Sequence, residues 1–397
     1  MLRSKFLRSS LPMKASTSSA FLSRSFTLLA ALAFTTTGVA ASPQFSVLDL
    51  GAFLVGDSYA TGVNDLGEVT GYGQFETGGP VHGFLFSGGV MHDLGSVGDS
   101  LSFGSAINNH GQVVGNYEPT GFIGDLPFLA SIGNFTPLGT LDGIRGEATG
   151  INDAGAAVGT SYLPDGGPSR AVLYHGGNVI DLGSLGGRAT DASIGTAINN
   201  SGQITGYSST LTNTGAAFLT VGGVMTELGS LGGVFSIGAD VNEAGVVAGL
   251  STLPNSSYYH ATRFTGGNAL DLGTLGGTIS VASSINGGGQ IIGRSRLPGR
   301  DDPVGFVWED GVMYNLNDLI PADSGIVGID LEGVGPNGIN EAGQIAAFGI
   351  IDGEYHALLL TPVAVPEPGA ATLLAALGVI CLWRRLALAR SAIPRRR

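Results

Sequence analysis

The stretch Asn199-Asn200-Ser201-Gly202-Gln203-Ile204-Thr205-Gly206 decides the fold, because close variants of it recur along almost the whole chain. Every copy has Ile or Val, then Asn, two free positions, Gly and a short apolar run. The copies lie 44, 44, 47, 43, 44 and 54 residues apart, and their asparagines are Asn64, Asn108, Asn152, Asn199, Asn242, Asn286 and Asn340. Seven copies at this spacing are typical of a repeat architecture.

The composition indicates a turn-rich, all-β protein. The chain has 397 residues, of which 67 are Gly, 43 % are apolar and 12 % are charged. The glycines follow no collagen period, and the apolar content argues against disorder. The only cysteine, Cys381, lies in a C-terminal apolar segment. The body therefore forms no internal disulfide, and its stability must come from packing and strand pairing.

Charge is concentrated at the two ends of the chain. Of 18 basic residues, five lie in residues 1–41 and six in residues 366–397, whereas only one of the 31 acids, Glu367, lies in these ends. The body therefore carries 18 − 5 − 6 = 7 basic residues against 31 − 1 = 30 acids, a net charge near −23. Such a body repels nucleic acid and anionic lipid, so a nucleic-acid partner is excluded.

The N-terminus has the order of a secretory signal peptide. A basic region leads to the apolar run 26–34 and then to small residues ending at Ala40 and Ala41. We expect residues 1–41 to be the signal peptide, cleaved after Ala40 or Ala41. A retained membrane anchor is the alternative, although the apolar run is short for a span.

The C-terminus combines a short motif, an apolar run and an arginine cluster. The motif is Val365-Pro366-Glu367-Pro368, the apolar run covers 369–383, and Arg384-Arg385 follows. Fifteen helical residues reach about 22 Å, short of the ~30 Å hydrocarbon core, so we expect an apolar helix that spans the membrane only marginally. The arginines would hold the C-terminus inside and leave the body outside.

This tail resembles the PEP-CTERM sorting signal of Gram-negative bacteria, in which Pro366, Glu367, Pro368, Arg384 and Arg385 are the sorting residues. The resemblance implies an exosortase partner, a transient membrane anchor, removal of the tail, and delivery to the outer surface or an exopolysaccharide matrix. The stretch 386–397 after the arginine pair is longer than the usual basic stub. A plain anchor without processing is the alternative. The chain thus divides into 1–41, a body of 42–363 and a tail of 364–397.

Each repeat predicts four short strands, and residues 42–365 give about 46 residues a unit, the size of a propeller blade. The first unit lacks its opening strand, and a spare copy begins at His356. We therefore predict a seven-bladed β-propeller closed by strand exchange (velcro closure) between this spare strand and the strand near Phe45. An open solenoid or a pair of β-sandwiches would be the alternatives.

Two motifs in each unit have structural interpretations. The Asn and Gly of the repeated stretch suit a tight turn, in which Gly takes a positive φ, and lack the alternating carboxylates of a calcium loop. The second motif, Asp-Leu-Gly, is predicted to turn a corner with its Leu between sheets; its acids are Asp49, Asp93, Asp181, Glu227 and Asp271. A phosphate loop is excluded here, since the body contains no Lys.

The body resembles the HAF family of extracellular repeats. The resemblance rests on His260-Ala261 and His356-Ala357, on the Asp-Leu-Gly-Thr-Leu-Gly-Gly core 271–277, and on the stretch 198–206. It implies secretion and a repeat architecture but no reaction. Several units lose the His, and we interpret the retained ones as bonding a neighbouring carbonyl rather than a metal. The sequence contains no Ser-His-Asp signature, HExxH or Cys/His cluster, so we predict no catalytic residue, cofactor or metal, and calcium is unsupported.

Residues that break the repeat frame are the candidate ligand-binding residues, because insertions in repeats map to loops that often bind. Most are acids around the longer last unit, and two tyrosines offer stacking faces to a sugar. The candidates are Asp301, Asp302, Asp318, Asp323, Asp330, Glu332, Tyr258 and Tyr259. The interpretation that they form only solvated loops stays open.

The leading function is a non-enzymatic, exported repeat protein that binds exopolysaccharide or a surface protein. One alternative is a secreted carbohydrate-active hydrolase or lyase with paired carboxylates on one propeller face. Another is a structural coat or matrix component.

Overall fold

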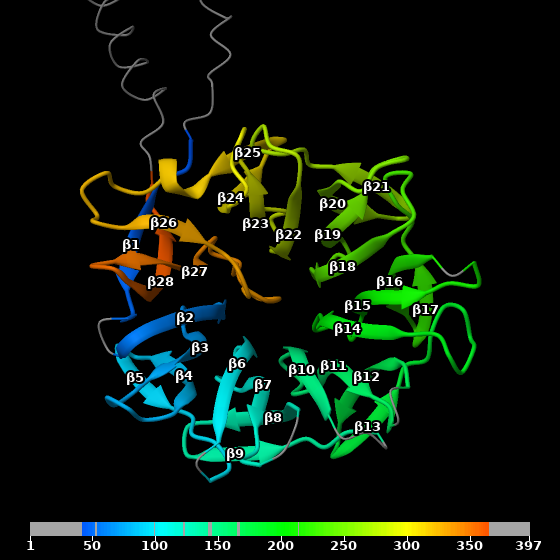
Figure 1. Cartoon of the computed structure of the whole chain (residues 1–397), viewed down its shortest axis with the longest axis horizontal. Coiled ribbons are helices and arrows are strands. Elements are labelled where there is room, and N and C mark those ends of the chain that lie inside the picture. The colour runs from blue at the N-terminus through cyan, green and yellow to red at the C-terminus, as the bar shows by residue number, and fades with distance from the viewer. Residues whose placement is uncertain are drawn as a thin grey trace, which may run out of the picture. The chain divides into compact units, whose positions relative to one another are not determined.

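The repeated Asn turn joins the two innermost strands of a β-sheet in the first six of seven sheets, and the sheets stand around a common centre (Figure 1). The computed structural model describes residues 42–51, 54–98, 100–121, 124–141, 145–164, 167–212 and 214–364. The predicted signal peptide, 1–41, and residues 365–397 of the predicted tail lie outside these residues. The described part is a seven-bladed β-propeller without an α-helix, which confirms the predicted fold class.

Six sheets each use four consecutive strands, in order from the centre outward. They are β2 (Val55–Val63), β3 (Val69–Gln74), β4 (Val81–Ser87), β5 (Val90–Asp93); β6 (Leu101–Ile107), β7 (Val113–Glu118), β8 (Leu126–Ser131), β9 (Asn134–Pro137); β10 (Arg145–Ile151), β11 (Ala157–Tyr162), β12 (Ser169–His175), β13 (Asn178–Asp181); β14 (Ser193–Ile198), β15 (Ile204–Ser209), β16 (Gly215–Val221), β17 (Val224–Glu227); β18 (Ser236–Val241), β19 (Val247–Thr252), β20 (Tyr259–Thr265), β21 (Asn268–Asp271); and β22 (Ser280–Ile285), β23 (Ile291–Arg296), β24 (Pro303–Glu309), β25 (Val312–Asn315).

The seventh sheet takes strands from both ends of the body. Its order is β26 (Val327–Asp330), β27 (Ile345–Ile351), β28 (Glu354–Pro362) and β1 (Phe45–Asp49). Strand β1 pairs antiparallel with β28, from Phe45 opposite Pro362 to Asp49 opposite Leu358. A short 3₁₀ turn, η3 (Leu316–Asp318), lies between β25 and β26. Below, the sheets are called blades 1 to 7, starting with β2–β5.

The Asn turns form for the reason that the sequence suggested. In blade 4 the Asn199 side-chain oxygen accepts the backbone N–H of Gln203 at 2.8 Å, and the Gly202 N–H donates to the Asn199 carbonyl at 3.0 Å. Gly202 has φ +75°, a conformation that costs glycine little. The interpretation of this motif as a structural turn is confirmed.

A second glycine is fixed by the close approach of two strands. On the second strand of blade 5, a Cβ placed on Gly249 would lie 2.0 Å from the carbonyl oxygen of Ile237. Blades 1 to 4 and 6 have the same clash at 1.8–2.0 Å. Blade 7 has Ala347 at this position, and its inner strand β26 has only four residues, ending beside it at Asp330. A side chain at this point is incompatible with the path that the inner strand follows in the other blades.

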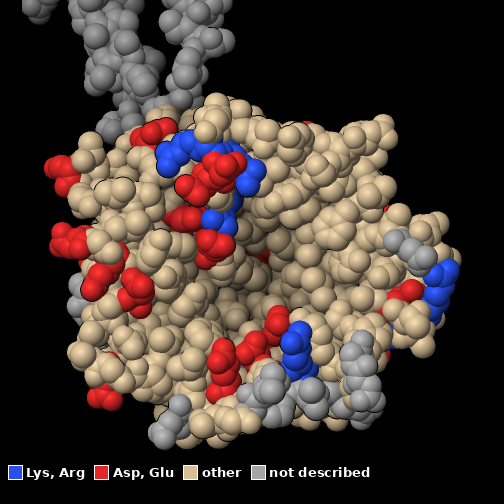
Figure 2. All heavy atoms as spheres, viewed as in Figure 1, with Lys and Arg blue, Asp and Glu red and all other residues tan. Residues whose placement is uncertain are grey.

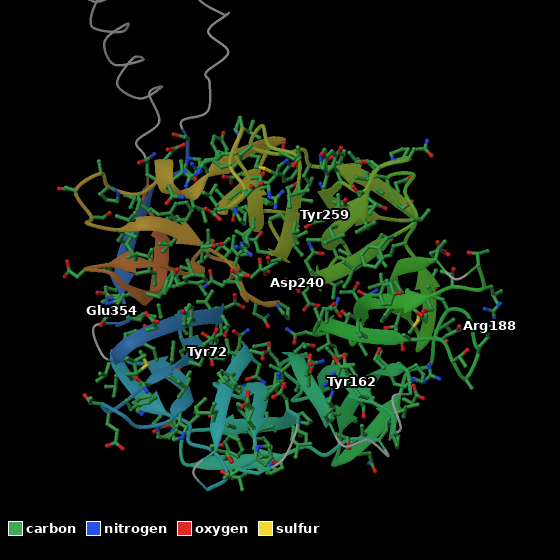
Figure 3. All side chains as sticks on the ribbon, in the orientation of Figure 1. Tyr72, Tyr162, Arg188, Asp240, Tyr259 and Glu354 are labelled. Atoms are coloured by element: carbon green, nitrogen blue, oxygen red, sulfur yellow. The ribbon has the colours of Figure 1, made fainter. Side chains whose placement is uncertain are left out.

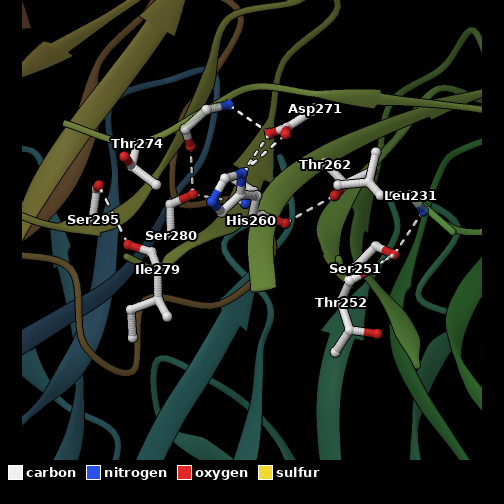
Figure 4. A network of polar contacts seen from close by, with 12 residues as sticks. Leu231, Ser251, Thr252, His260, Thr262, Asp271, Thr274, Ile279, Ser280 and Ser295 are labelled. Carbon is white, nitrogen blue, oxygen red and sulfur yellow. Dashed lines mark hydrogen bonds and ion pairs between the residues drawn. The ribbon is translucent and has the colours of Figure 1, made fainter. Parts of the chain in front are cut away.

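The repeated His and Asp residues pair with each other across the two outer strands (Figure 4). His260 Nδ1 lies 2.9 Å from the Asp271 carboxylate, and His82–Asp93 and His356–Asp49 match it at 3.0 Å. The Asp271 carboxylate also accepts the Gly273 N–H at 2.8 Å. The expectation that these imidazoles bond a carbonyl was wrong, because the facing Asp-Leu-Gly carboxylate lies within reach and is the stronger acceptor. The Leu of that motif is buried as predicted, at Leu94, Leu228 and Leu272.

A buried serine at the start of an inner strand fastens each of several blades to the one before it. Ser280 Oγ donates to the Gly273 carbonyl and accepts the Ala261 N–H, both in blade 5 (Figure 4). Ser58 of blade 1 accepts the Ala357 N–H of blade 7 at 3.0 Å. Between the blades, the core is filled by apolar side chains, including the fully buried Phe84, Phe128, Phe218, Phe264 and Phe306.

Among the described residues, no helix has the length and apolar character needed to cross a bilayer. The apolar segment 369–383, where the sequence predicts a helix, lies outside them.

Candidate functional site

One end of the central channel is lined by the seven asparagines of the repeated turn. Each side-chain Nδ2 donates to the backbone carbonyl of the corresponding Asn in the next blade, at 2.8–3.1 Å. The last bond of the circuit runs from Asn340 back to Asn64 at 2.8 Å. A cavity of about 360 Å³ lies inside this ring. We call this part of the channel the Asn end.

The residues that follow the asparagines form a second, outer circle. The Asn109 N–H donates to Asp153, and the Asp153 N–H donates to Asn200, at 2.8 and 2.7 Å. The circle is interrupted at Gly287, which has no side chain and only donates, to Glu341. The carboxylates here therefore satisfy neighbouring backbone and amide donors. Within the described ranges, no group of three or more His, Cys, Asp or Glu side chains is placed to hold a metal ion.

The extra residues of the last unit cross the channel. After β26, the segment 333–338 passes between the blades: the Gly335 N–H donates to Thr61 at 3.1 Å, and the Asn337 carbonyl accepts from Val63 at 2.8 Å. Asn337 and Ile339 line the cavity at the Asn end, whereas Gly333–Pro336 line a separate cavity. Sequence reasoning expected the added residues on loops of one face, and part of them instead closes the channel.

Asp240 is a buried carboxylate in the channel wall that sequence reasoning missed (Figure 3). Its oxygens accept the Val241 and Ile285 N–H groups and lie 2.7 Å from Ser284 Oγ. Burial raises the pKa of Asp240, against these hydrogen bonds. The residue has partners for both oxygens in blades 5 and 6, which indicates a structural role.

The opposite end of the channel opens as a hollow of about 470 Å³ (Figure 2). We call it the hollow. In every blade the residue after the fixed glycine, or after Ala347 in blade 7, faces a partner on the inner strand. These pairs form part of the wall of the hollow in blades 2, 3, 5 and 6, through Asn116, Glu147, Ile237, Leu250 and Val281. These variable pairs are Tyr59–Tyr72, Phe103–Asn116, Glu147–Thr160, Ile194–Tyr207, Ile237–Leu250, Val281–Arg294 and Asp330–Phe348. The backbone frame repeats, whereas these side chains differ from blade to blade.

A charged cluster stands on one side of the hollow. Arg294 Nε lies 2.7 Å from Asp330, and Arg294 Nη2 lies 3.2 Å from Glu332. Glu332 is exposed, and together with Arg294 and Tyr259 it lines a smaller cavity of about 250 Å³ beside the hollow. Figure 2 shows acidic and basic side chains gathered at two places on the rim, with largely uncharged surface between them.

The structure brings together three of the eight predicted ligand residues, namely Asp330, Glu332 and Tyr259. Asp318 and Asp323 are exposed on the connection from β25 to β26, outside the residues that line the three cavities. Asp301 and Asp302 are exposed between β23 and β24, and Asp301 is 3.8 Å from Arg296. Tyr258 is half exposed and lines none of these cavities. Sequence reasoning missed Arg294.

A tyrosine stack is the other feature that the sequence did not reveal. The rings of Tyr59 and Tyr72 are stacked with centroids 5.1 Å apart, and Tyr355 stacks on Tyr59 at 5.6 Å. Burial raises the pKa of Tyr59 to about 12, and the neighbouring Asp57 carboxylate adds to the shift. A comparison of aligned units could have found both features, as the positions that change while their neighbours stay fixed.

Comparison with known proteins identifies the C-terminal segment. Residues 364–386 match the PEP-CTERM protein-sorting motif. This motif confirms the sorting signal and indicates a secreted protein that is processed by an exosortase, anchored transiently in the membrane and exported to the cell surface of a Gram-negative bacterium.

The chain has no match among curated proteins. Among solved structures it is similar to TolB from Acinetobacter baumannii (TM-score 0.41, 10 % identity, 79 % of this chain and 65 % of that one) and to a putative TolB from Agrobacterium tumefaciens (0.43, 12 %, 70 % and 95 %). It is also similar to a gluconolactonase, XC5397, from Xanthomonas campestris (0.39, 11 %, 81 % and 95 %). The chain spans about two thirds of the first of these proteins. Scores of this size carry no inference about activity.

Proposed function

We propose that this exported propeller is a non-enzymatic binding protein of the cell surface, and that its hollow binds a polysaccharide of the extracellular matrix. The observation that carries the proposal is the contrast within each blade. The turn asparagine is the same in all seven blades and its hydrogen bonds are made internally, whereas the variable pair at the hollow differs in every blade. Side chains that vary over a concave surface of a fixed scaffold are suited to ligand recognition.

The chemistry of the rim supports a polyhydroxylated ligand. The cluster of Arg294, Asp330 and Glu332 offers both donors and acceptors, and Tyr259 lines the same cavity. Charged groups form stronger hydrogen bonds to hydroxyls than neutral groups do. If the ligand were instead a surface protein, it would bind the same face, with a different share of apolar contacts.

We also propose that the body belongs to the HAF type of extracellular repeat and that strand exchange in blade 7 closes the ring. The pairing of β1 with β28 and the Asp49–His356 pair support the closure. Cysteines introduced for Ser46 and Thr361, which face each other, are expected to form a disulfide in the folded protein. The single variants are the controls. Thiols that stay free in the folded double variant would contradict the closure.

The binding experiment uses the full chain and the polysaccharide purified from the matrix of the producing cells. We expect saturable binding by biolayer interferometry and no change in polymer length after prolonged incubation. The double variant Arg294→Gln, Glu332→Gln is expected to lose most of the binding while it remains folded. If the polymer became shorter, the protein would be a hydrolase or lyase. If the wild-type protein did not bind, the proposed function would be wrong.

A further inference from the structure

The tyrosine stack lies across the junction of blades 7 and 1 and takes no part in the repeated turns and strand contacts described above. Its middle ring, Tyr59, is nearly parallel to both neighbours, with interplanar angles of 28° to Tyr72 and 30° to Tyr355. Phe348 meets Tyr59 edge-on at 5.0 Å, and Phe103 meets Tyr72 edge-on at 5.1 Å. The two phenylalanines therefore hold the three phenol rings in position.

The phenol hydroxyls of the stack are free for a ligand. Within the part of the chain that the structure describes, no hydrogen bond is made by the hydroxyl of Tyr59, Tyr72 or Tyr355. By contrast, the Tyr162 hydroxyl donates to Glu147 at 3.3 Å. The Tyr59 and Tyr72 hydroxyls are not among the buried polar atoms without a partner, and Tyr355 is exposed, so these hydroxyls reach solvent and a ligand can accept from them.

The tyrosine stack has acidic neighbours. Tyr59 and Tyr72 form the variable pair of blade 1. The corresponding pairs of blades 3 and 5 contribute Glu147 and Leu250 to the lining of the hollow, whereas the tyrosines of the stack do not line it. Burial raises the pKa of Tyr59 and of Tyr72, and the Glu332 carboxylate adds to both shifts. Asp57 adjoins the other side, where it accepts the Tyr355 N–H at 2.9 Å.

We propose that the tyrosine stack is the subsite for a non-acidic pyranose chain, with the exposed Tyr355 ring as the stacking platform. The Tyr59 and Tyr72 hydroxyls would donate to sugar oxygens, and Glu332 would accept from sugar hydroxyls. Tyr355 is 39 % exposed, which leaves ring surface for contact. The proposal rests on the proposed function and narrows its ligand class.

The negative charge around the tyrosine stack is the reason that we expect the bound polysaccharide to be non-acidic. Asp57 and Glu332 flank the tyrosines, and the body carries a net charge near −23. A polymer with a carboxylate on every sugar would be repelled by both the local and the overall charge, and most strongly at low salt. The affinity of a neutral polysaccharide is not lowered by this negative charge.

The test compares laminarin, hydroxyethyl cellulose, dextran and the polysaccharide of the cells' own matrix with the uronate polymer alginate, at low and high salt. Isothermal titration calorimetry with the full chain should detect binding to at least one non-acidic polymer and none to alginate. The double variant Tyr59→Phe, Tyr72→Phe keeps the rings and removes two donors, so affinity should fall roughly tenfold with the melting temperature little changed. Tyr355→Ala should weaken binding by a similar factor.

Tyr207→Phe is the matched control, because Tyr207 belongs to the variable pair of blade 4 and packs on Phe235 instead of on the stack. If the wild-type protein binds a non-acidic polymer and the stack variants bind equally well, the subsite is wrong and the proposed function stands. Equal binding of alginate would also overturn the subsite. If the wild-type protein binds none of the polymers, both proposals fail.

Discussion

The two ends of the channel are built from the same seven blades but differ in how much their side chains repeat. At the Asn end, each turn carries the same residue, and its side chain bonds the next turn, as Asn242 does with Asn286 at 3.1 Å. Toward the other end, each blade presents a different pair, and the pairs of blades 2, 3, 5 and 6 line the hollow. The first end ties the turn of each blade to the turn of the next. The second uses that rigid frame to hold side chains that the fold does not need.

The largest effect on the frame is expected from Gly249→Ala. The new Cβ would lie 2.0 Å from the Ile237 carbonyl oxygen, which is backbone and cannot move away without breaking the strand pair. We expect a loss in the free energy of unfolding of about 3 kcal/mol or more, measured by urea denaturation. The control is Gly288→Ala, a free turn position where other repeats carry Ala154, Ala244 and Ala342. Equal losses for the two variants would mean that the clash is not the reason for the glycine.

Removing one asparagine should cost somewhat less. Asn242→Ala deletes a donor to the Asn286 carbonyl and the acceptor of the Ala244 and Val246 N–H groups, and leaves the buried Val246 N–H without its acceptor. We expect a loss of about 2–3 kcal/mol. Asn178→Ala, which removes an exposed side chain with one bond to Gly176, is the control and should change stability by less than about 0.5 kcal/mol.

Changes at the hollow should separate binding from stability. Arg294→Gln removes the charge that joins Asp330 to Glu332, and because these groups are partly exposed the loss of stability should be about 1 kcal/mol or less. Polysaccharide affinity should nevertheless fall about tenfold. Thermal unfolding and interferometry on the same samples measure both effects. The exposed Arg300→Gln is the control, and a similar loss of affinity there would indicate a general charge effect.

The smallest effect is expected in alkaline solution. The Tyr59 phenol keeps its proton up to a pKa of about 12 in the folded protein, whereas it ionises near 10 in the unfolded chain. Between these values the folded state binds more protons, so stability falls as pH rises through this window. Tyr59→Phe should remove part of that fall, measured as the melting temperature from pH 9 to 11. An unchanged slope would show that Tyr59 ionises normally.

The repeated turns and strands of the blades are predicted well from the sequence because the same pattern occurs in each unit. The Asn turn, the Asp-Leu-Gly corner and the all-β, seven-unit ring follow from a pattern that occurs several times. The hollow could not be predicted in the same way, because its residues are defined by their failure to repeat. Tyr59 and Tyr355 are nearly 300 residues apart, and Arg294 meets Asp330 only because β26 is the inner strand of the next blade. The acids at 301, 302, 318 and 323 break the pattern too, yet the fold leaves them on exposed connections.

The most direct measurement compares two charge-removing double variants of the full chain, titrated with the matrix polysaccharide by calorimetry. Arg294→Gln with Glu332→Gln changes the hollow, and Asp65→Asn with Asp153→Asn changes the Asn end, in each case with side chains of nearly the same shape. We expect the first pair to lose binding and the second pair to bind like the wild type. Retained binding in the first pair with loss in the second would contradict the assignment of the hollow as the binding surface.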